Sequence, residues 1–134
     1  LAMGQVRLFE GLTDIERDIL RSAATLKKCK KDEIIIKQGK PLERMFIILE
    51  GQAEIRVNGE VVATLPEGSL VGEVEFLDKL PASADVVVLR ESTLIELNNA
   101  WLANLMEMHP RLGYVLMSEI ARTEGQRLRA MDQK

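Results

Sequence analysis

The alternation of apolar and polar residues divides the chain into a helical start, a middle of short strands and a helical end. The start is marked by Thr13-Asp14-Ile15-Glu16, a capping box in which the Thr13 hydroxyl and the Glu16 carboxylate can each satisfy a free backbone N–H group. Three apolar residues then recur at intervals of four: Ile15, Ile19 and Ala23. This spacing places them on one face of a helix, which we expect over about residues 13–25.

Short β-branched runs separated by turn residues fill the middle of the chain, from about residue 26 to residue 97. They predict at least six strands: Glu33–Lys37, Met45–Leu49, Ala53–Val57, Val61–Leu65, Ala84–Arg90 and Thr93–Leu97. Asn58-Gly59 stands between two of these runs, and both residues tolerate the positive φ angles of a two-residue hairpin turn. The pattern is typical of an all-β sandwich or barrel with antiparallel strands.

Helical spacing returns after Leu97, with Asn98 or Asn99 as the cap. Pro110 ends this helix and suits the first turn of another. We therefore expect two C-terminal helices over about residues 99–131, the last of them from about Arg111 to Met131.

One face of the last predicted helix repeats at spacings of three and four, as the seam of a coiled coil does. Its members are Tyr114, Met117, Ala121, Glu124, Leu128 and Met131. Two interpretations remain open. Either this face packs onto the chain's own barrel, or it forms a parallel homodimer through the 111–131 helix.

Composition narrows the class of protein. With 134 residues, of which 46% are hydrophobic, the chain matches a single domain over residues 1–134. The net charge of −3 and the scattered lysines and arginines argue against direct nucleic-acid binding by this chain.

One cysteine and one histidine cannot assemble a disulfide or a Cys/His metal cluster within one chain. No apolar run approaches the roughly 20 residues of a membrane span and no signal-peptide pattern is present, so we expect a cytoplasmic protein without membrane insertion.

Four segments together resemble the cyclic-nucleotide-binding domain of bacterial catabolite activators, protein kinase A regulatory subunits and nucleotide-gated channels. They are Leu8–Leu12, Ile34–Gly39, Met45–Gly51 (MFIILEG) and Gly68–Val86 (GSLVGEVEFLDKLPASADV). The resemblance runs from Leu8 to about Met131. It implies an antiparallel β-barrel of the jelly-roll or double-stranded β-helix type, with an N-terminal helix and two C-terminal helices. It also implies a regulatory, non-enzymatic domain that takes cAMP or cGMP and controls a separate effector, which the sequence does not identify.

The residues Gly72–Val86, called the cassette below, correspond to the phosphate-binding cassette of that family. The resemblance implies that backbone N–H groups at the cassette's start face the cyclic phosphate and that Glu73 accepts a hydrogen bond from the ribose 2′-hydroxyl. The ligand-binding residues carried over in this way are Val71, Gly72, Glu73, Val74, Ala82, Ser83 and Ala84. Arg122 and Arg127 of the last helix are candidate lid contacts.

Three cassette positions depart from the family pattern. Ala82 stands where the family has the arginine that binds the phosphate, Glu75 replaces a small residue, and Asp85 replaces a threonine or similar residue. A hydrogen bond to a charged partner contributes about 1.5 to 3 kcal/mol, so loss of the arginine alone corresponds to roughly 10- to 100-fold weaker binding.

Three interpretations of the cassette remain open. In the first, a cyclic nucleotide still binds through Glu73, the cassette backbone and Ser83, with Arg122 or Arg127 supplying the positive charge. In the second, the site has lost its ligand or taken a neutral or cationic one, and the domain persists as a dimerising or transmitting module. In the third, Glu75 and Asp85 face solvent and the cassette is a surface loop.

Other chemistry has weaker support. His109 lies at a helix junction without a nucleophile motif, so we expect no catalytic residue. Glu73, Glu75 and Asp78 do not match the spacing of a calcium loop, so we expect no metal site. Cys29 beside four lysines is either a reactive thiol or a half-buried strand cysteine. The lysine run Lys27–Lys31 either touches an acidic partner or guards a solvated strand edge.

Overall fold

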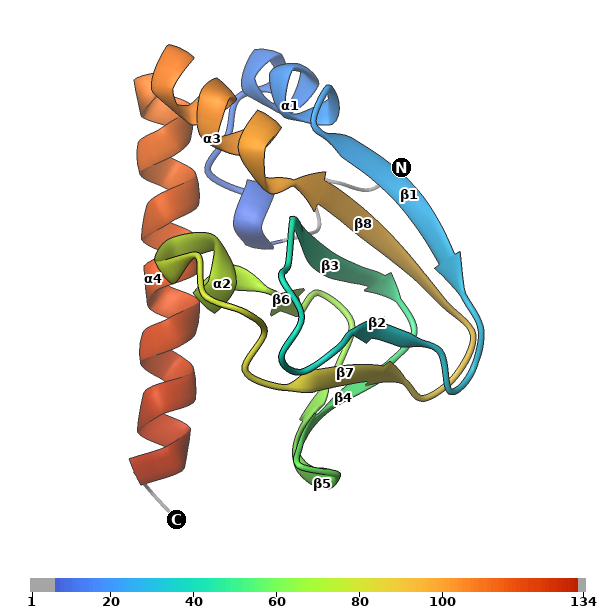
Figure 1. The fold of residues 1–134 in the computed structure, drawn as a ribbon. Helices are drawn as coiled ribbons and strands as arrows, with labels where there is room; N and C mark the ends of the chain where they lie inside the picture. Colours follow the sequence, from blue (N-terminus) through green and yellow to red (C-terminus); the bar gives the residue numbers. More distant parts are fainter. Residues whose placement is uncertain (1–6, 133–134) are drawn as a thin grey trace. The chain divides into compact units, whose positions relative to one another are not determined.

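The computed structural model describes residues 7–132, which divide into two compact units (Figure 1). The strand unit is Ala24–Asn99, and the helical unit consists of the described residues on either side of that segment. Residues 1–6 and 133–134 lie outside the described part of the chain. The single domain expected over residues 1–134 stays a prediction.

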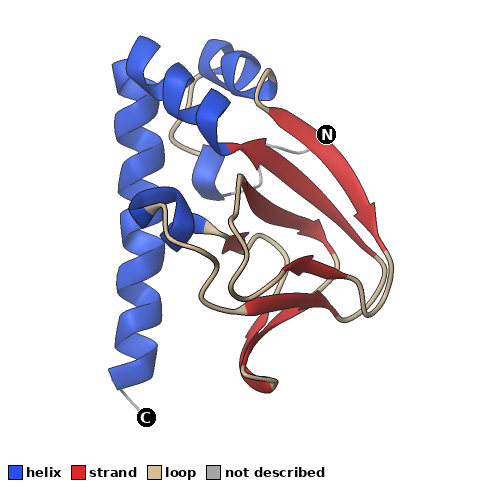
Figure 2. Cartoon of the chain, in the orientation of Figure 1, coloured by secondary structure: helices blue, strands red, loops and turns tan. Residues whose placement is uncertain are grey.

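Two four-stranded antiparallel sheets make up the strand unit, drawn as red arrows in Figure 2. In one sheet the order is β1 (Ala24–Cys29), β8 (Ser92–Asn98), β3 (Arg44–Glu50) and β6 (Leu70–Val71). In the other it is β2 (Ile34–Ile36), β7 (Asp85–Val88), β4 (Ala53–Val57) and β5 (Glu60–Leu65). Strands distant in sequence are neighbours in both sheets, so the predicted mainly β, antiparallel jelly-roll fold class with flanking helices is confirmed.

The inner faces of both sheets share one apolar core. Its buried members are Cys29, Ile36, Phe46, Ile48, Ala53, Leu65, Val71, Ala82, Val86, Val88 and Leu94. Because successive side chains of a strand point to opposite faces, membership of this core identifies the inward-facing residues of each strand. On β7, Val86 and Val88 face inward, and Asp85 and Val87 therefore face outward.

The turn predicted at Asn58-Gly59 joins β4 to β5. Both residues have positive φ angles, 52° for Asn58 and 83° for Gly59, as a two-residue hairpin of this kind requires. The hairpin prediction is confirmed.

All six predicted strands are present. β6 was not predicted, and β1 matches the strand edge that was one interpretation of Lys27–Lys31, although it was not among the six runs. β1 is rich in lysine and lies at the edge of its sheet, so it lacks the apolar alternation of a strand with a buried face. β6 has only two residues. The helix expected over about 13–25 is wrong at its end, because α1 (Asp14–Arg21) stops at Arg21 and Ala24 and Thr25 pair with β8 instead.

The helical unit contains the short 3₁₀ helix η2 (Arg7–Phe9), α1, α3 (Asn99–Met108) and α4 (Pro110–Asp132). α3 starts at Asn99, the last residue of the strand unit. The predicted capping box is confirmed, since Glu16 N–H donates to Thr13 Oγ1 (3.2 Å) and Thr13 N–H donates to Glu16 Oε1 (2.8 Å). Pro110 begins α4, as predicted.

Of the described residues of the predicted seam of α4, Tyr114, Met117, Ala121 and Leu128 are exposed and Glu124 is half-buried. Tyr114 is 75% exposed and Leu128 is 59% exposed, while the buried face of α4 consists of Leu112, Leu116 and Ile120. Packing of the seam onto the chain's own barrel and a homodimer through the 111–131 helix both stay predictions. Of the seam residues, the side chain of Met131 lies outside the described part of the chain.

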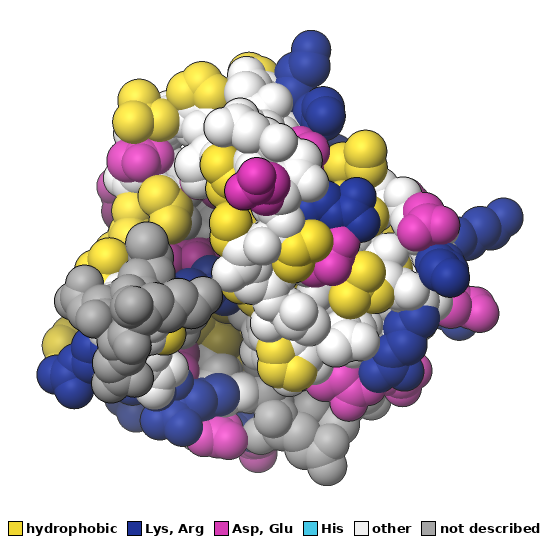
Figure 3. All heavy atoms as spheres, turned by 90° about the horizontal axis from the view of Figure 1, so that it is seen from below, with side chains coloured by type: hydrophobic (Ala, Val, Ile, Leu, Met, Phe, Trp, Pro, Cys, Tyr) yellow, Lys and Arg dark blue, Asp and Glu magenta, His cyan; other side chains and the backbone are white. Residues whose placement is uncertain are grey.

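Lysines and arginines are dispersed among acidic side chains on the face seen in Figure 3. Among residues 7–132, none of the helices has the length and apolar character needed to cross a membrane.

Candidate functional site

The cassette begins at a sharp turn that only glycine accommodates. Gly72 links β6 to α2 (Glu73–Asp78) with a φ of 88°, and it is the N-cap of α2. A Cβ at this position would lie 2.9 Å from Leu42 Cδ2 and 3.2 Å from the Arg44 carbonyl oxygen. The turn therefore brings the start of α2 close to β3, and Gly72 offers no side chain to cap the first N–H groups of α2.

The first turn of α2 carries two buried carboxylates. Glu73 is 2% exposed and Glu75 is 8% exposed, whereas Val74 between them is half-buried. Glu73, the residue expected to bind a ribose hydroxyl, is thus held in the interior beside Val71, a member of the core. The third interpretation is wrong for Glu75, because its side chain does not face solvent.

The second half of the cassette starts at Ala82, the residue that the resemblance places at the arginine position. Ala82 is 4% exposed and belongs to the apolar core between the sheets. Both of its backbone groups are used: its N–H donates to the Lys40 carbonyl (2.9 Å), and its carbonyl accepts from Gly39 N–H (2.8 Å). The next residue, Ser83, is exposed, and Ala84 is half-buried.

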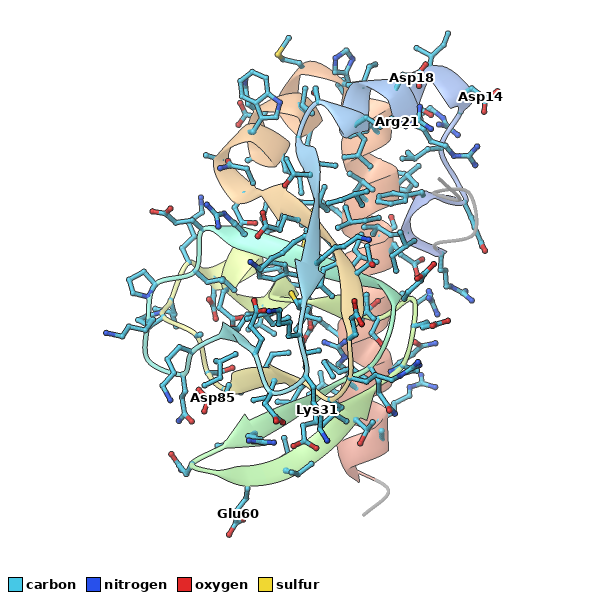
Figure 4. The ribbon with its side chains drawn as sticks, turned by 90° about the vertical axis from the view of Figure 1, so that its right-hand side faces the viewer. Asp14, Asp18, Arg21, Lys31, Glu60 and Asp85 are labelled. Carbon is cyan, nitrogen blue, oxygen red and sulfur yellow. The ribbon has the colours of Figure 1, made fainter. Side chains whose placement is uncertain are left out.

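Asp85, labelled in Figure 4, lies on the outer face of its sheet. Gln38 N–H donates to its Oδ1 (2.7 Å), and Lys37 Nζ lies 3.5 Å from its Oδ2. The Gln38 N–H first, and then the Lys37 and Arg56 charges, hold the pKa of this carboxyl below its ordinary value. Only 16% of the side chain is exposed, so the solvent-facing interpretation is wrong here too. The negative charge of Asp85 is taken up by the protein itself.

Arg56 completes the charge balance on this outer face. It stands opposite Asp85 in the ladder between β4 and β7, and its Nε donates to Glu54 Oε1 (2.6 Å). Two acids, Glu54 and Asp85, thus lie beside two cations, Arg56 and Lys37. The group carries no net charge.

The two candidate lid residues belong to the helical unit, and neither is an uncommitted cation. The Arg122 guanidinium binds the Glu119 carboxylate with two nitrogens, and Arg7 Nε also lies 3.1 Å from Glu119. The hydrogen bond from Arg122 is the main reason that the pKa of Glu119 is lowered. Arg127 is half-buried and also interacts within the protein. The Glu119 carboxylate therefore already offsets the positive charge that Arg122 could offer to a phosphate.

Sequence reasoning missed the residues that hold the cassette's second half. These are Gln38, Gly39 and Lys40, which follow β2. Asn58 at the hairpin tip binds Gln38 in turn. Gly39 in the sequence Lys37-Gln38-Gly39-Lys40 is a local signal for a turn. The cassette residues that this turn binds lie more than 40 residues away in the chain, so the local sequence does not reveal them.

The remaining candidates have structural roles. Cys29 is buried, and burial first, with the nearby Glu33 carboxylate, raises the pKa of its thiol to about 11. The reactive-thiol interpretation is therefore wrong, and the strand cysteine is fully rather than half buried. β1 lies at a sheet edge, and Lys27 lies 3.6 Å from Glu33 within the strand unit. Within residues 7–132, no three His, Cys, Asp or Glu side chains are grouped so as to hold a metal ion.

Comparison with known proteins adds independent information. The sequence profile of the family described as cyclic nucleotide-binding domain matches residues 26–109. A cAMP-dependent protein kinase regulatory subunit of Mycosarcoma maydis is 36% identical over 85 residues, which are 60% of this chain and 16% of that protein. The chain thus spans a small part of that relative.

Two solved structures have closely similar folds. The catabolite activator protein of Thermus thermophilus has a TM-score of 0.77 at 26% identity, over 95% of this chain and 60% of that one. A triple variant of the regulatory subunit of a cAMP-independent protein kinase A of Trypanosoma brucei has a TM-score of 0.78 at 28% identity, over 90% of this chain and 44% of that one. That variant is bound to cAMP, and its substitutions remove a glutamate and introduce an arginine.

Proposed function

The chain belongs to the cyclic nucleotide-binding domain family, and we propose that it is a non-catalytic regulatory sensor domain whose affinity for cAMP and cGMP is low. The observation that carries this proposal is the burial of Ala82 in the apolar core, at the position that resembles the family's phosphate-binding arginine. The buried Glu73 and the glycine turn at Gly72 support a retained ribose-binding half. A cyclic nucleotide could therefore bind through its ribose at Glu73, but it would lack a positively charged partner for its phosphate at Ala82.

The expected loss is large enough to measure. A hydrogen bond to a charged group contributes about 1.5 to 3 kcal/mol, which corresponds to roughly 10- to 100-fold in affinity. The arginine-introducing variant of the trypanosome regulatory subunit, which is bound to cAMP, supports the idea that charge in such a site can be restored. We therefore expect Ala82→Arg to raise cyclic-nucleotide affinity.

Calorimetric titration of the chain with cAMP and cGMP tests this function. We expect no heat of binding at micromolar nucleotide for the unmodified chain and measurable binding for Ala82→Arg, which Glu73→Ala then abolishes. Ser83→Arg is the matched control, because it places the same charge at the exposed neighbouring residue. Since Ala82 is buried, cooperative thermal unfolding of each variant is checked first. Submicromolar binding by the unmodified chain, or an equal gain from both arginine variants, would contradict the proposal.

A second candidate is a domain that has exchanged its ligand or works without one. The observation that favours it is the pair of buried carboxylates, Glu73 and Glu75, at a cassette without the arginine. Such a site suits a neutral or cationic ligand better than an anion. Failure of a well-folded Ala82→Arg variant to bind either nucleotide would favour this candidate.

We further propose that the domain acts in the cytoplasm as a homodimer and controls an effector that the sequence does not identify. The exposed seam of α4, including Tyr114, Met117 and Leu128, supports a parallel helix pair. Light scattering should give the dimer mass for the unmodified chain and the monomer mass for Leu128→Glu. Ser118→Glu, an exposed change outside the seam, should remain dimeric. A monomer in every case would eliminate the homodimer.

A further inference from the structure

The residues Lys37–Lys40, called the strap below, form a tight turn after β2. Lys40 N–H donates to the Lys37 carbonyl (3.1 Å), and Gly39, the third residue of the turn, has a φ of 86°. A type II turn has this hydrogen bond and requires a positive φ at its third residue. A Cβ at Gly39 would meet nothing within 4 Å, so the glycine is needed for its backbone angle alone.

On one side the strap binds the end of the cassette at two residues, Ala82 and Asp85. Gly39 and Lys40 pair with both backbone groups of Ala82, at 2.8 and 2.9 Å. Three residues further on, the Gln38 N–H and the Lys37 ammonium both bind the Asp85 carboxylate. Because hydrogen bonds with an ionised partner are about twice as strong as neutral ones, Asp85 is the stronger of the two attachments.

On the other side the strap is tied to the β4–β5 hairpin. Asn58 N–H donates to Gln38 Oε1 (3.0 Å), and Gln38 Nε2 donates to Asn58 Oδ1 (3.1 Å). Gln38 therefore uses its backbone for the cassette and its side chain for the hairpin tip. One residue links two parts of the strand unit that are not adjacent in sequence.

We propose that Gln38 and Asp85 are positioning residues, which act through the strap to set the geometry of the cassette end, Ala82–Asp85, relative to the hairpin tip. Asp85 is then a clasp of the strap and not a group that meets the ligand. The expected effect of these residues on nucleotide affinity rests on the proposed function. The mechanical coupling between the hairpin tip and the cassette end does not depend on that proposal. Substitution of Gln38 should raise the mobility of Ala82, although the hydrogen bonds of Gln38 go to Asp85 and Asn58.

Amide hydrogen exchange of the full chain without ligand tests the coupling. We expect Gln38→Ala to raise the exchange rate of the Asn58 amide and also that of the Ala82 amide, by about fivefold for the loss of one hydrogen bond's worth of stability. Asp85→Ala should raise exchange at Gln38 and Ala82, and Asp85→Asn should restore protection at Gln38, because the amide oxygen remains an acceptor. Lys31→Ala, in the exposed turn labelled in Figure 4, is the control and should change none of them.

The pattern of exchange decides the proposal whether or not any nucleotide binds. If Gln38→Ala raises exchange at Asn58 and leaves Ala82 unchanged, the strap does not couple the two parts and the proposal fails. If all amides respond in proportion to a lowered midpoint of thermal unfolding, the effect is global and the proposal also fails.

Affinity supplies the second readout. In the Ala82→Arg background, Gln38→Ala should weaken cAMP binding about fivefold. Unchanged affinity together with faster Ala82 exchange would overturn the positioning role. If a folded Ala82→Arg variant does not bind cAMP at all, the proposed function is contradicted. The coupling through the strap is then tested by hydrogen exchange alone.

Discussion

In the first half of the cassette, Gly72–Glu75, a glycine turn and two buried carboxylates follow each other within one helical turn, whereas in the second half, Ala82–Asp85, the side chains serve the protein's own structure. Ala82 fills the core between the sheets, and Asp85 holds the strap from the outer face. The first half contains Gly72 and Glu73, which we propose as the start of a ligand site. In the second half, Ala82 and Asp85 have structural roles that local sequence does not reveal.

The largest effect is expected at Gly72, because the backbone turn of the first half requires glycine at this position. Gly72→Ala should lower the free energy of unfolding by about 3 kcal/mol, because a positive φ costs an L-residue roughly 1 to 2 kcal/mol and crowding against the Arg44 carbonyl adds a similar amount. Urea denaturation measures the change.

Gly68→Ala is the matched control for this prediction. Its φ of 87° is nearly the same, but a Cβ there meets nothing within 4 Å. It should cost only about 1 to 2 kcal/mol for the backbone angle. Equal losses at both glycines would mean that Gly72 is not confined by β3.

A smaller effect tests the charge balance of Asp85. An unbalanced charge about 10 Å from a phosphate would contribute about 1.7 kcal/mol at an effective dielectric near 20, which is roughly tenfold in affinity. In the Ala82→Arg background, Asp85→Asn should instead change cAMP affinity less than about twofold, because Lys37 and Arg56 already balance that charge. Calorimetry on the single and the double variant measures the difference. A tenfold gain from Asp85→Asn would mean that the charge of Asp85 acts on the ligand.

The smallest expected effect is the pH dependence of the clasp. The pKa of Asp85 is lowered from its ordinary value of 3.8, so its contribution to stability is complete above that value and is lost as the pH falls through the lowered pKa. Thermal unfolding of the unmodified chain and of Asp85→Asn should therefore differ most near neutral pH and converge in strong acid.

Glu60→Gln, at the exposed end of β5, is the control for acid effects in general. Its difference from the unmodified chain should stay nearly constant with pH. A difference at Asp85 that grows in acid would reverse the sign and contradict the clasp.

Local signals in the sequence were sufficient for several elements of the fold. The Thr13 capping box, the Asn58-Gly59 hairpin and the start of α4 at Pro110 each depend on residues within a few positions of one another. β1 was not among the predicted apolar runs, and α1 was extended too far, for the opposite reason. The pairing of Ala24–Cys29 with a strand about 70 residues away overrides the local helical spacing.

The sequence by itself determined which residues stand in the cassette, with Gly72 and Glu73 at its start and Ala82 at the position that we propose as the family's arginine position, because these are identities at single positions. The tertiary structure alone decided what the neighbouring acids do. Glu75 is drawn into the interior, and Asp85 is turned outward to Gln38 and Lys37. The face on which a strand residue lies is set by its register with partner strands, and those partners come from distant parts of the chain.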